Sequence, residues 1–147
     1  MNTRELKFRH ELSRLMSGIW EITWHEDGRV NPGVPDMSVV SRGDNPTGYE
    51  TTWIELKAPS EKVSALFSLG LEASQIQWID THKLLVPILV LARFSDGIYY
   101  CDPGTTGEWK QELTGEGWRY PVAGKFTQET NIRQVLAEVV RTMSARS

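Results

Sequence analysis

The 147-residue sequence lacks the features that mark secreted or membrane-bound proteins. Its single cysteine, Cys101, excludes an internal disulfide and is typical of a reducing compartment. No apolar run is long enough to span a bilayer, and the amino-terminal residues are charged rather than signal-like. We therefore expect a cytoplasmic protein that has no membrane partner.

The chain also lacks a strong excess of charge of either sign. Its formal net charge is −3, which argues mildly against a protein that coats nucleic acid nonspecifically. It does not exclude a nuclease, because metal would mask several acids and only the local potential acts on phosphates. The length predicts one domain, 1–147, which is large enough for a hydrophobic core.

A clustered set of soft metal ligands is missing as well. The three histidines, His10, His25 and His82, are scattered through the sequence. Zinc sites are built from closely spaced histidine and cysteine ligands. We therefore expect each histidine to be a surface or packing residue.

Two short apolar runs are the most informative part of the sequence. Residues 37–40 and 51–57 are rich in β-branched and aromatic types and are bounded by Gly, Pro, Asn and Asp, so both predict strands. The cluster of turn residues at 41–48 predicts that the two strands form a hairpin with a long loop.

Charged residues occupy defined places on this predicted hairpin. Asp36 heads the first strand, and Glu55 and Lys57 share one face of the second, because alternate strand residues point the same way. Two carboxylates and one ammonium suit a hard divalent cation, and the amine could hold or activate a water. The alternative is that Glu55 and Lys57 form the solvated face of an alternating strand.

The remaining patterns complete an α/β architecture. They predict helices over 3–17, 73–84 and 128–143 and strands over 19–25, 86–92 and 98–101. This order predicts a mixed sheet with helices against it, in which the middle helix joins two parallel strands. The predicted core spans about 3–101, the apolar stretch 63–71 is ambiguous, and 102–147 adds a turn-rich segment and the last helix.

Three further groups of residues have both a structural and a functional interpretation. The first helix is the most basic stretch and presents either a solvated face or phosphate contacts. Glu11, beside its apolar stripe, is either a solvated flank or a residue that points into a site. The aromatic residues of the turn-rich segment either cover a core edge or stack on bases; they are Trp109, Trp118 and Tyr120.

Three motifs together resemble the PD-(D/E)xK nuclease superfamily. They are Gly33-Val-Pro-Asp36, Trp53-Ile-Glu55-Leu-Lys57 and Gln75-x-x-Trp78. The virus-type replication-repair nucleases and the Holliday junction resolvases have the same G-x-PD, E-x-K and glutamine elements in this order. The resemblance covers roughly residues 3–93 and implies a restriction-endonuclease-like fold, a mixed β-sheet flanked by helices.

The resemblance also implies roles for individual residues. Asp36, Glu55 and the backbone carbonyl of Leu56 would bind Mg²⁺, for which Mn²⁺ would substitute. Lys57 would position or deprotonate the attacking water, and Gln75 would steady the site from the start of its helix.

Relatives of this kind use one more carboxylate, often from the first helix. Glu11 is the best match by its distance to Asp36, and Glu5 is second. Glu26, in the loop before G-x-PD, is a third candidate.

The function implied by the resemblance is that of a Mg²⁺-dependent endodeoxyribonuclease. The first hypothesis is a structure-selective enzyme for branched or junction DNA, which would act as a homodimer to cut paired strands. The second is a nuclease of the same fold that nicks duplexes or cuts flaps or single strands. The third is a noncatalytic nucleic-acid-binding module. A bacteriophage origin, with action in the host cytoplasm, follows from family analogy alone.

Overall fold

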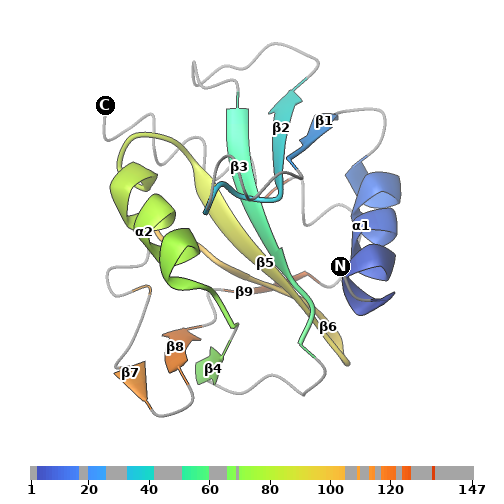
Figure 1. Cartoon of the computed structure of the whole chain (residues 1–147). Helices are drawn as coiled ribbons and strands as arrows, with labels where there is room; N and C mark the ends of the chain where they lie inside the picture. The colour runs from blue at the N-terminus through green and yellow to red at the C-terminus, as the bar shows by residue number, and fades with distance from the viewer. Residues whose placement is uncertain are drawn as a thin grey trace.

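The computed structural model describes eleven parts of the chain. They are residues 3–16, 20–25, 33–41, 51–59, 66–68, 70–104, 109, 113–114, 117–121, 124–126 and 134. Within these parts two helices and nine strands follow one another in the order α1 (Thr3–Met16), β1 (Trp20–Trp24), β2 (Met37–Ser41), β3 (Thr51–Lys57), β4 (Leu66–Ser68), α2 (Ala73–His82), β5 (Ile88–Phe94), β6 (Gly97–Cys101), β7 (Leu113–Thr114), β8 (Gly117–Pro121) and β9 (Gly124–Phe126). Figure 1 shows this arrangement.

A six-stranded mixed sheet forms the centre of the fold, with the strand order β1-β2-β3-β5-β6-β9. The pair β3 and β5 is parallel, with Glu55 opposite Val90, and the other neighbouring pairs of this sheet are antiparallel. Helix α2 lies in the connection between β3 and β5, as expected for a crossover between parallel strands. The predicted hairpin of residues 37–40 and 51–57 is confirmed by the pairing of β2 with β3.

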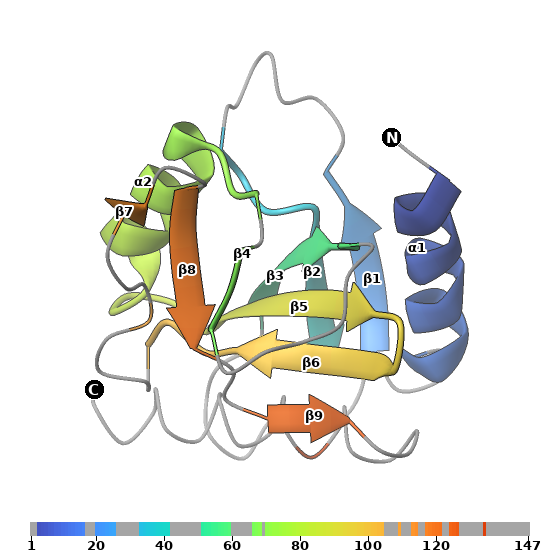
Figure 2. The same ribbon diagram turned by 90° about the horizontal axis from the view of Figure 1, so that it is seen from below.

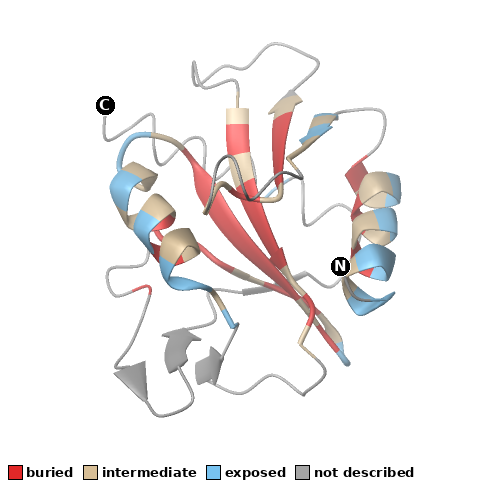
Figure 3. Ribbon diagram, in the orientation of Figure 1, coloured by how far each residue is buried: buried red, intermediate tan, exposed pale blue. Residues whose placement is uncertain are grey.

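The two helices cover different faces of this sheet, and each encloses its own apolar cluster. On one face, Phe8, Leu12 and Met16 of α1 pack with Ile54 of β3. These three helix residues recur every four positions, which explains why this segment forms an amphipathic helix. On the other face, a second cluster includes Ile79 of α2. Figure 2 shows α1 and α2 on opposite sides of β3 and β5, and Figure 3 shows that both strands are largely buried.

Several element boundaries differ from those predicted by the sequence. The predicted helix 73–84 ends at His82 and is followed by a turn, and the predicted strand 86–92 is shifted to Ile88–Phe94. Pro87 has no N–H to donate and directly precedes this strand, where that loss is tolerated.

The turn-rich segment contains short strands that the sequence pattern did not predict. β9 pairs with β6 and so extends the main sheet beyond the predicted core limit at residue 101. β7 and β8 form a separate three-stranded sheet with β4, which comes from the ambiguous stretch 63–71. The predicted helix 128–143 lies outside the described residues, except for Gln134.

Two further expectations concern membranes and aromatic side chains. No helix in the described part of the chain is long and apolar enough to cross a membrane. Trp109, a candidate for base stacking, is instead 1% exposed and donates its indole N–H to Asp80 Oδ1 at 2.9 Å. It therefore packs in the core, while the side chains of Trp118 and Tyr120 lie outside the described residues.

Candidate active site

Asp36 lies at the edge of β3, just beyond the point where β2 and β3 stop pairing. The last paired residues are Met37 and Ile54. Beyond these residues, the Asp36 side chain takes the place of a backbone partner for β3, because its Oδ2 accepts the backbone N–H of Leu56 at 2.9 Å. The side chain is thereby fixed beside the segment that contains Glu55.

Glu55 and Lys57 project from the same face of β3, as the strand period predicted. Lys57 Nζ lies 3.8 Å from Glu55 Oε1. Glu55 is only 1% exposed, so it does not belong to a solvated face. The alternative interpretation of these two residues is therefore wrong for Glu55, and the buried carboxylate requires partners.

Gln75 supplies those partners from the first turn of α2. Its Nε2 donates to Glu55 Oε1 at 3.0 Å. Its Oε1 accepts a hydrogen bond from Lys57 Nζ at 3.2 Å and another from the backbone N–H of Glu72 at 2.8 Å. One amide thus fixes the acid, the amine and the start of the helix relative to one another.

Gly33 allows the Asp36 segment to lie against the start of α2. Its φ angle is 87°, in the left-handed region that glycine enters at little cost. A Cβ atom at this position would lie 2.2 Å from the backbone oxygen of Ser74. The first residue of the G-x-PD motif is therefore required by conformation and by space.

Arg9 reaches the site from α1 and was not singled out by the sequence pattern. Its Nη2 lies 3.7 Å from Asp36 Oδ1, and its guanidinium carbon lies 4.7 Å from the centroid of the Trp24 ring. Such a cation–π contact holds a guanidinium in place. The only sequence signal for Arg9 was its membership of the basic first helix.

The three candidates for an additional carboxylate have different positions. Glu11 does not join Asp36 and Glu55; its Oε1 lies 3.2 Å from Arg93 Nε. Glu5 precedes Arg9 by one helical turn and is partly exposed. Glu26 lies outside the described residues.

The electrostatics of the site suit a divalent cation. Burial raises the pKa of the Glu55 carboxyl well above its usual value, and the charge of Asp36 raises it further, whereas Lys57 lowers it. A cation held by both carboxylates would offset the burial and the repulsion. The donors are oxygens, which fits Mg²⁺ or Mn²⁺. Among the described residues, no third acidic, histidine or cysteine side chain completes a metal-binding group.

A row of four aromatic rings borders the site on the α2 face. His25 stacks on Trp53 with centroids 5.1 Å apart, Trp53 lies 5.5 Å from Trp78, and Trp78 stacks on His82 at 3.9 Å. Trp53 precedes Glu55 by two residues and so lies on the same face of β3. The row connects the start of the hairpin with α2 and confirms the packing role expected for His25 and His82.

Comparison with known proteins gives information about the fold. The chain matches no protein-family model, and no curated protein sequence matches it. It is similar to the solved structure of Hjc from Archaeoglobus fulgidus, a Holliday junction resolvase from an archaeal hyperthermophile, with a TM-score of 0.52 and 13% identity over 81% of this chain and 84% of that chain. The chain has a restriction-endonuclease-like fold. Four predicted site residues, Asp36, Glu55, Lys57 and Gln75, come together where β2 and β3 stop pairing, beside the start of α2.

Proposed function

We propose that this protein is a metal-dependent DNA endonuclease that hydrolyses phosphodiester bonds in branched DNA. The observation that carries the proposal is the contact of Gln75 with both Glu55 and Lys57, beside Asp36. Asp36 directly precedes β2, Glu55 and Lys57 belong to β3, and Gln75 belongs to the first turn of α2. Unrelated surface residues from three elements would not be expected to contact one another in this way. The structural similarity to a Holliday junction resolvase supports the choice of substrate.

Asp36, Glu55 and the backbone carbonyl of Leu56 would hold Mg²⁺, and Mn²⁺ would substitute. When bound, the ion would neutralise the phosphodiester oxygens and stabilise the developing negative charge. We leave Glu11 out of this ligand set because its carboxylate contacts Arg93. Glu5 and Glu26 remain the candidates for a further carboxylate.

Lys57 would act on the attacking water. Its ammonium is held by Gln75 Oε1 and lies beside the buried Glu55. From this position it could donate hydrogen bonds to the water and to the phosphate, or accept a proton when it is neutral. Gln75 would keep both groups in a productive orientation, as required for catalysis by positioning.

The selectivity and assembly of the enzyme belong to the same proposal. Cutting the two strands of a junction symmetrically requires two sites related by a two-fold axis, and hence a homodimer. Such an activity would act in DNA recombination or repair. A bacteriophage origin is proposed from family analogy alone, because the G-x-PD element at Gly33–Asp36 is common to the virus-type nucleases and the junction resolvases.

A panel of labelled DNA substrates tests the proposal. A four-way junction, a flap, a duplex and a single strand are incubated with the protein and Mg²⁺. We expect the junction to be cut at least tenfold faster than the duplex, and no cutting when EDTA is present. Equal cutting of all four would remove the junction selectivity and leave the nuclease.

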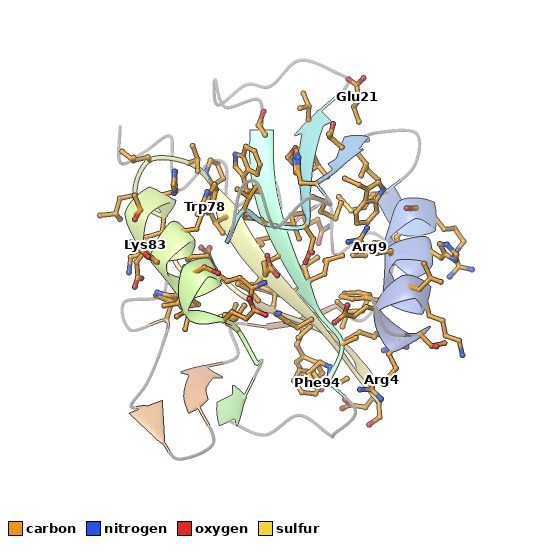
Figure 4. All side chains as sticks on the ribbon, viewed as in Figure 1. Arg4, Arg9, Glu21, Trp78, Lys83 and Phe94 are labelled. Carbon is orange, nitrogen blue, oxygen red and sulfur yellow. The ribbon has the colours of Figure 1, made fainter. Side chains whose placement is uncertain are left out.

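Two variants test the ligand assignment, with one matched control. Asp36→Asn and Glu55→Gln should each lower the cleavage rate by at least 10³-fold, an order of magnitude typical for lost metal catalysis. Glu21→Gln changes an exposed carboxylate on β1, which is labelled in Figure 4, and should cut at the wild-type rate. Cutting by Asp36→Asn at the wild-type rate would show that Asp36 is not a metal ligand.

A further inference from the structure

A groove with a volume of about 650 Å³ lies between α1 and the ends of β3 and β5. Its ionisable lining residues are Arg4, Lys7, His10, Glu11, Arg14 and Arg93. We propose that this groove binds backbone phosphates of the DNA that flanks the cleavage site. The inference rests on the proposed nuclease function and adds a second contact region for the same substrate.

The charge of the groove is the first argument. Four permanently cationic side chains face one carboxylate, Glu11, whereas the whole chain carries a net charge of −3. The positive potential is therefore local, and a local potential is what attracts a phosphate backbone. Lys7 and Arg14 are exposed and present their charge at the rim.

The fixed geometry of two arginines is the second argument. Arg4 Nε donates to the backbone oxygen of Ala58 at 3.1 Å. Arg93 is held by Glu11 at 3.2 Å and by the backbone oxygen of Phe94 at 3.2 Å. A guanidinium has five N–H donors, so these contacts orient each side chain while donors remain for a phosphate. Glu11 thus orients a cation of the groove.

The position of the groove is the third argument. Ala58 and Pro59 line it and directly follow Lys57 in the chain, so the groove adjoins the end of β3. It lies on the α1 side of this strand, whereas Glu55 and Lys57 contact Gln75 on the α2 side. Figure 2 shows the end of β3 and the β5–β6 hairpin both approaching α1, and Figure 4 labels Arg4 and Phe94 at this junction. A DNA strand that passes around the end of β3 from the active site would meet the groove.

The length of the groove fits a repeating anion. Lys7 and Arg14 are seven residues apart, which corresponds to about 10 Å along a helix axis. One strand of duplex DNA has a phosphate about every 3.4 Å along its axis. The distance between these two cations therefore corresponds to about three phosphate spacings along the duplex axis. The cationic lining of the groove, beside the end of the strand that carries Glu55 and Lys57, favours DNA over an acidic protein segment.

The test measures DNA binding as a function of salt in a background that does not cut. Full-length Glu55→Gln protein is titrated into a fluorescein-labelled four-way junction at several NaCl concentrations. Lys7→Gln and Arg14→Gln are added singly and together. Lys83→Gln, a cation at the end of α2 that pairs with Asp80, is the matched control. Melting curves confirm that each variant is folded.

The association constant K falls as salt rises, and we expect each single groove variant to make this dependence less steep, by about 0.9 in the slope of log K against log salt. If the variant and the background protein bind equally at 1 M salt, the variant should bind about eightfold more weakly at 0.1 M. The double variant should lose about twice that slope, and Lys83→Gln should bind as the background protein does. Unchanged affinity and slope in the double variant would overturn the groove. Equal competition by polyglutamate of the same charge would also overturn it, because the site would then bind polyanions in general.

The failure of the groove is distinguishable from the failure of the nuclease proposal. If the wild-type protein cleaves DNA with Mg²⁺, but Lys7→Gln and Arg14→Gln do not change DNA affinity, the groove proposal alone is refuted. If the groove variants bind DNA more weakly, but the wild-type protein cuts none of the substrates, the nuclease proposal alone is refuted. In an active protein, Lys7→Gln and Arg14→Gln should raise KM and leave kcat within about twofold, because the lost contacts are the same in the ground and transition states.

Discussion

Arg9 of α1 and Asp36, which directly precedes β2, form an ion pair with Nη2 and Oδ1 3.7 Å apart. The arginine side chain is 13% exposed and the aspartate side chain 29%, so water screens the pair only in part. Helix α1 therefore contributes a fixed cation next to a proposed metal ligand. A divalent ion that binds Asp36 must compete with this charge, and a bound phosphate would gain from it.

Replacing Arg9 should tighten metal binding. Arg9→Ala removes a positive charge about 4 Å from a ligand carboxylate, so the Kd for Mn²⁺ without DNA should fall roughly three- to tenfold. Isothermal titration calorimetry measures this change. Arg14→Ala, a cation of the same helix that lines the groove, should leave the Kd unchanged. Weaker metal binding in Arg9→Ala would show that Arg9 instead holds Asp36 in its binding position.

Glu55→Gln should stabilise the metal-free protein at high pH. Burial, and then the charge of Asp36, raise the pKa of Glu55 well above the usual 4.5. The folded state therefore binds this proton more tightly than the unfolded state, and that stability is lost as the pH rises through the folded pKa. Glutamine has no proton to lose.

The stability difference can be measured as a shift in Tm. At pH 8 the Tm of metal-free Glu55→Gln should exceed that of the wild type by a few degrees, and the difference should shrink towards pH 4.5. Saturating Mg²⁺ should raise the Tm of the wild type more than that of the variant. A constant difference across this pH range would contradict a raised pKa of the buried Glu55 carboxyl.

Gln75 should matter for catalysis through the groups that it holds. Gln75→Ala removes the hydrogen bonds to Glu55 and Lys57, and kcat should fall about 10- to 100-fold, as for other lost supports of metal ligands. Gln77→Ala changes an exposed glutamine of the same helix and should retain the wild-type kcat. Gln75→Glu would distinguish the two contacts. It keeps an acceptor for Lys57 but removes the N–H donor to Glu55 and places a second acid beside it.

Lys57→Ala should separate chemistry from metal binding. The loss of an ammonium 3.8 Å from Glu55 should lower kcat by about 10²–10⁴, a range typical for a general acid or base. By the same Coulomb argument as for Arg9, the Kd for Mn²⁺ should not rise and should fall by up to about tenfold. Lys83→Ala is the control for charge removal on the same face of the protein. Unchanged turnover in Lys57→Ala would exclude Lys57 from the mechanism.

The parts of the site that could be predicted are those set by local periodicity. Two residues on one strand share a face whatever surrounds them, so the proximity of Glu55 and Lys57 followed from the chain alone. The hairpin of β2 and β3 followed from two apolar runs and a turn cluster. Asp36 then had to lie at the edge of β3.

Contributions from α1 could not be predicted in the same way. Its apolar stripe shows which side faces the sheet, but Arg9 and Glu11 lie on opposite flanks of that stripe. Which flank meets Asp36 depends on how the helix is placed on the sheet, and this is a tertiary property. Glu11 was therefore assigned to the site, whereas the structure brings Arg9 there.

Short strands at the sheet edge escaped prediction for another reason. β9 consists of three residues, Gly124–Phe126, which are too few to show a period of two. β9 pairs with β6 because β6 has an edge that β5 does not occupy. Which strand edges are free depends on the folded sheet and cannot be read from the sequence pattern.

The parallel pairing of β3 with β5 has a consequence for how the protein matures during synthesis. Glu55 faces Val90 in the register, so the strand that shields this acid is made long after the acid itself. A nascent chain that stops short of Ile88 already carries every residue proposed for cleavage, yet cannot enclose them. Amino-terminal fragments that end before Ile88 should consequently lack the nuclease activity proposed above.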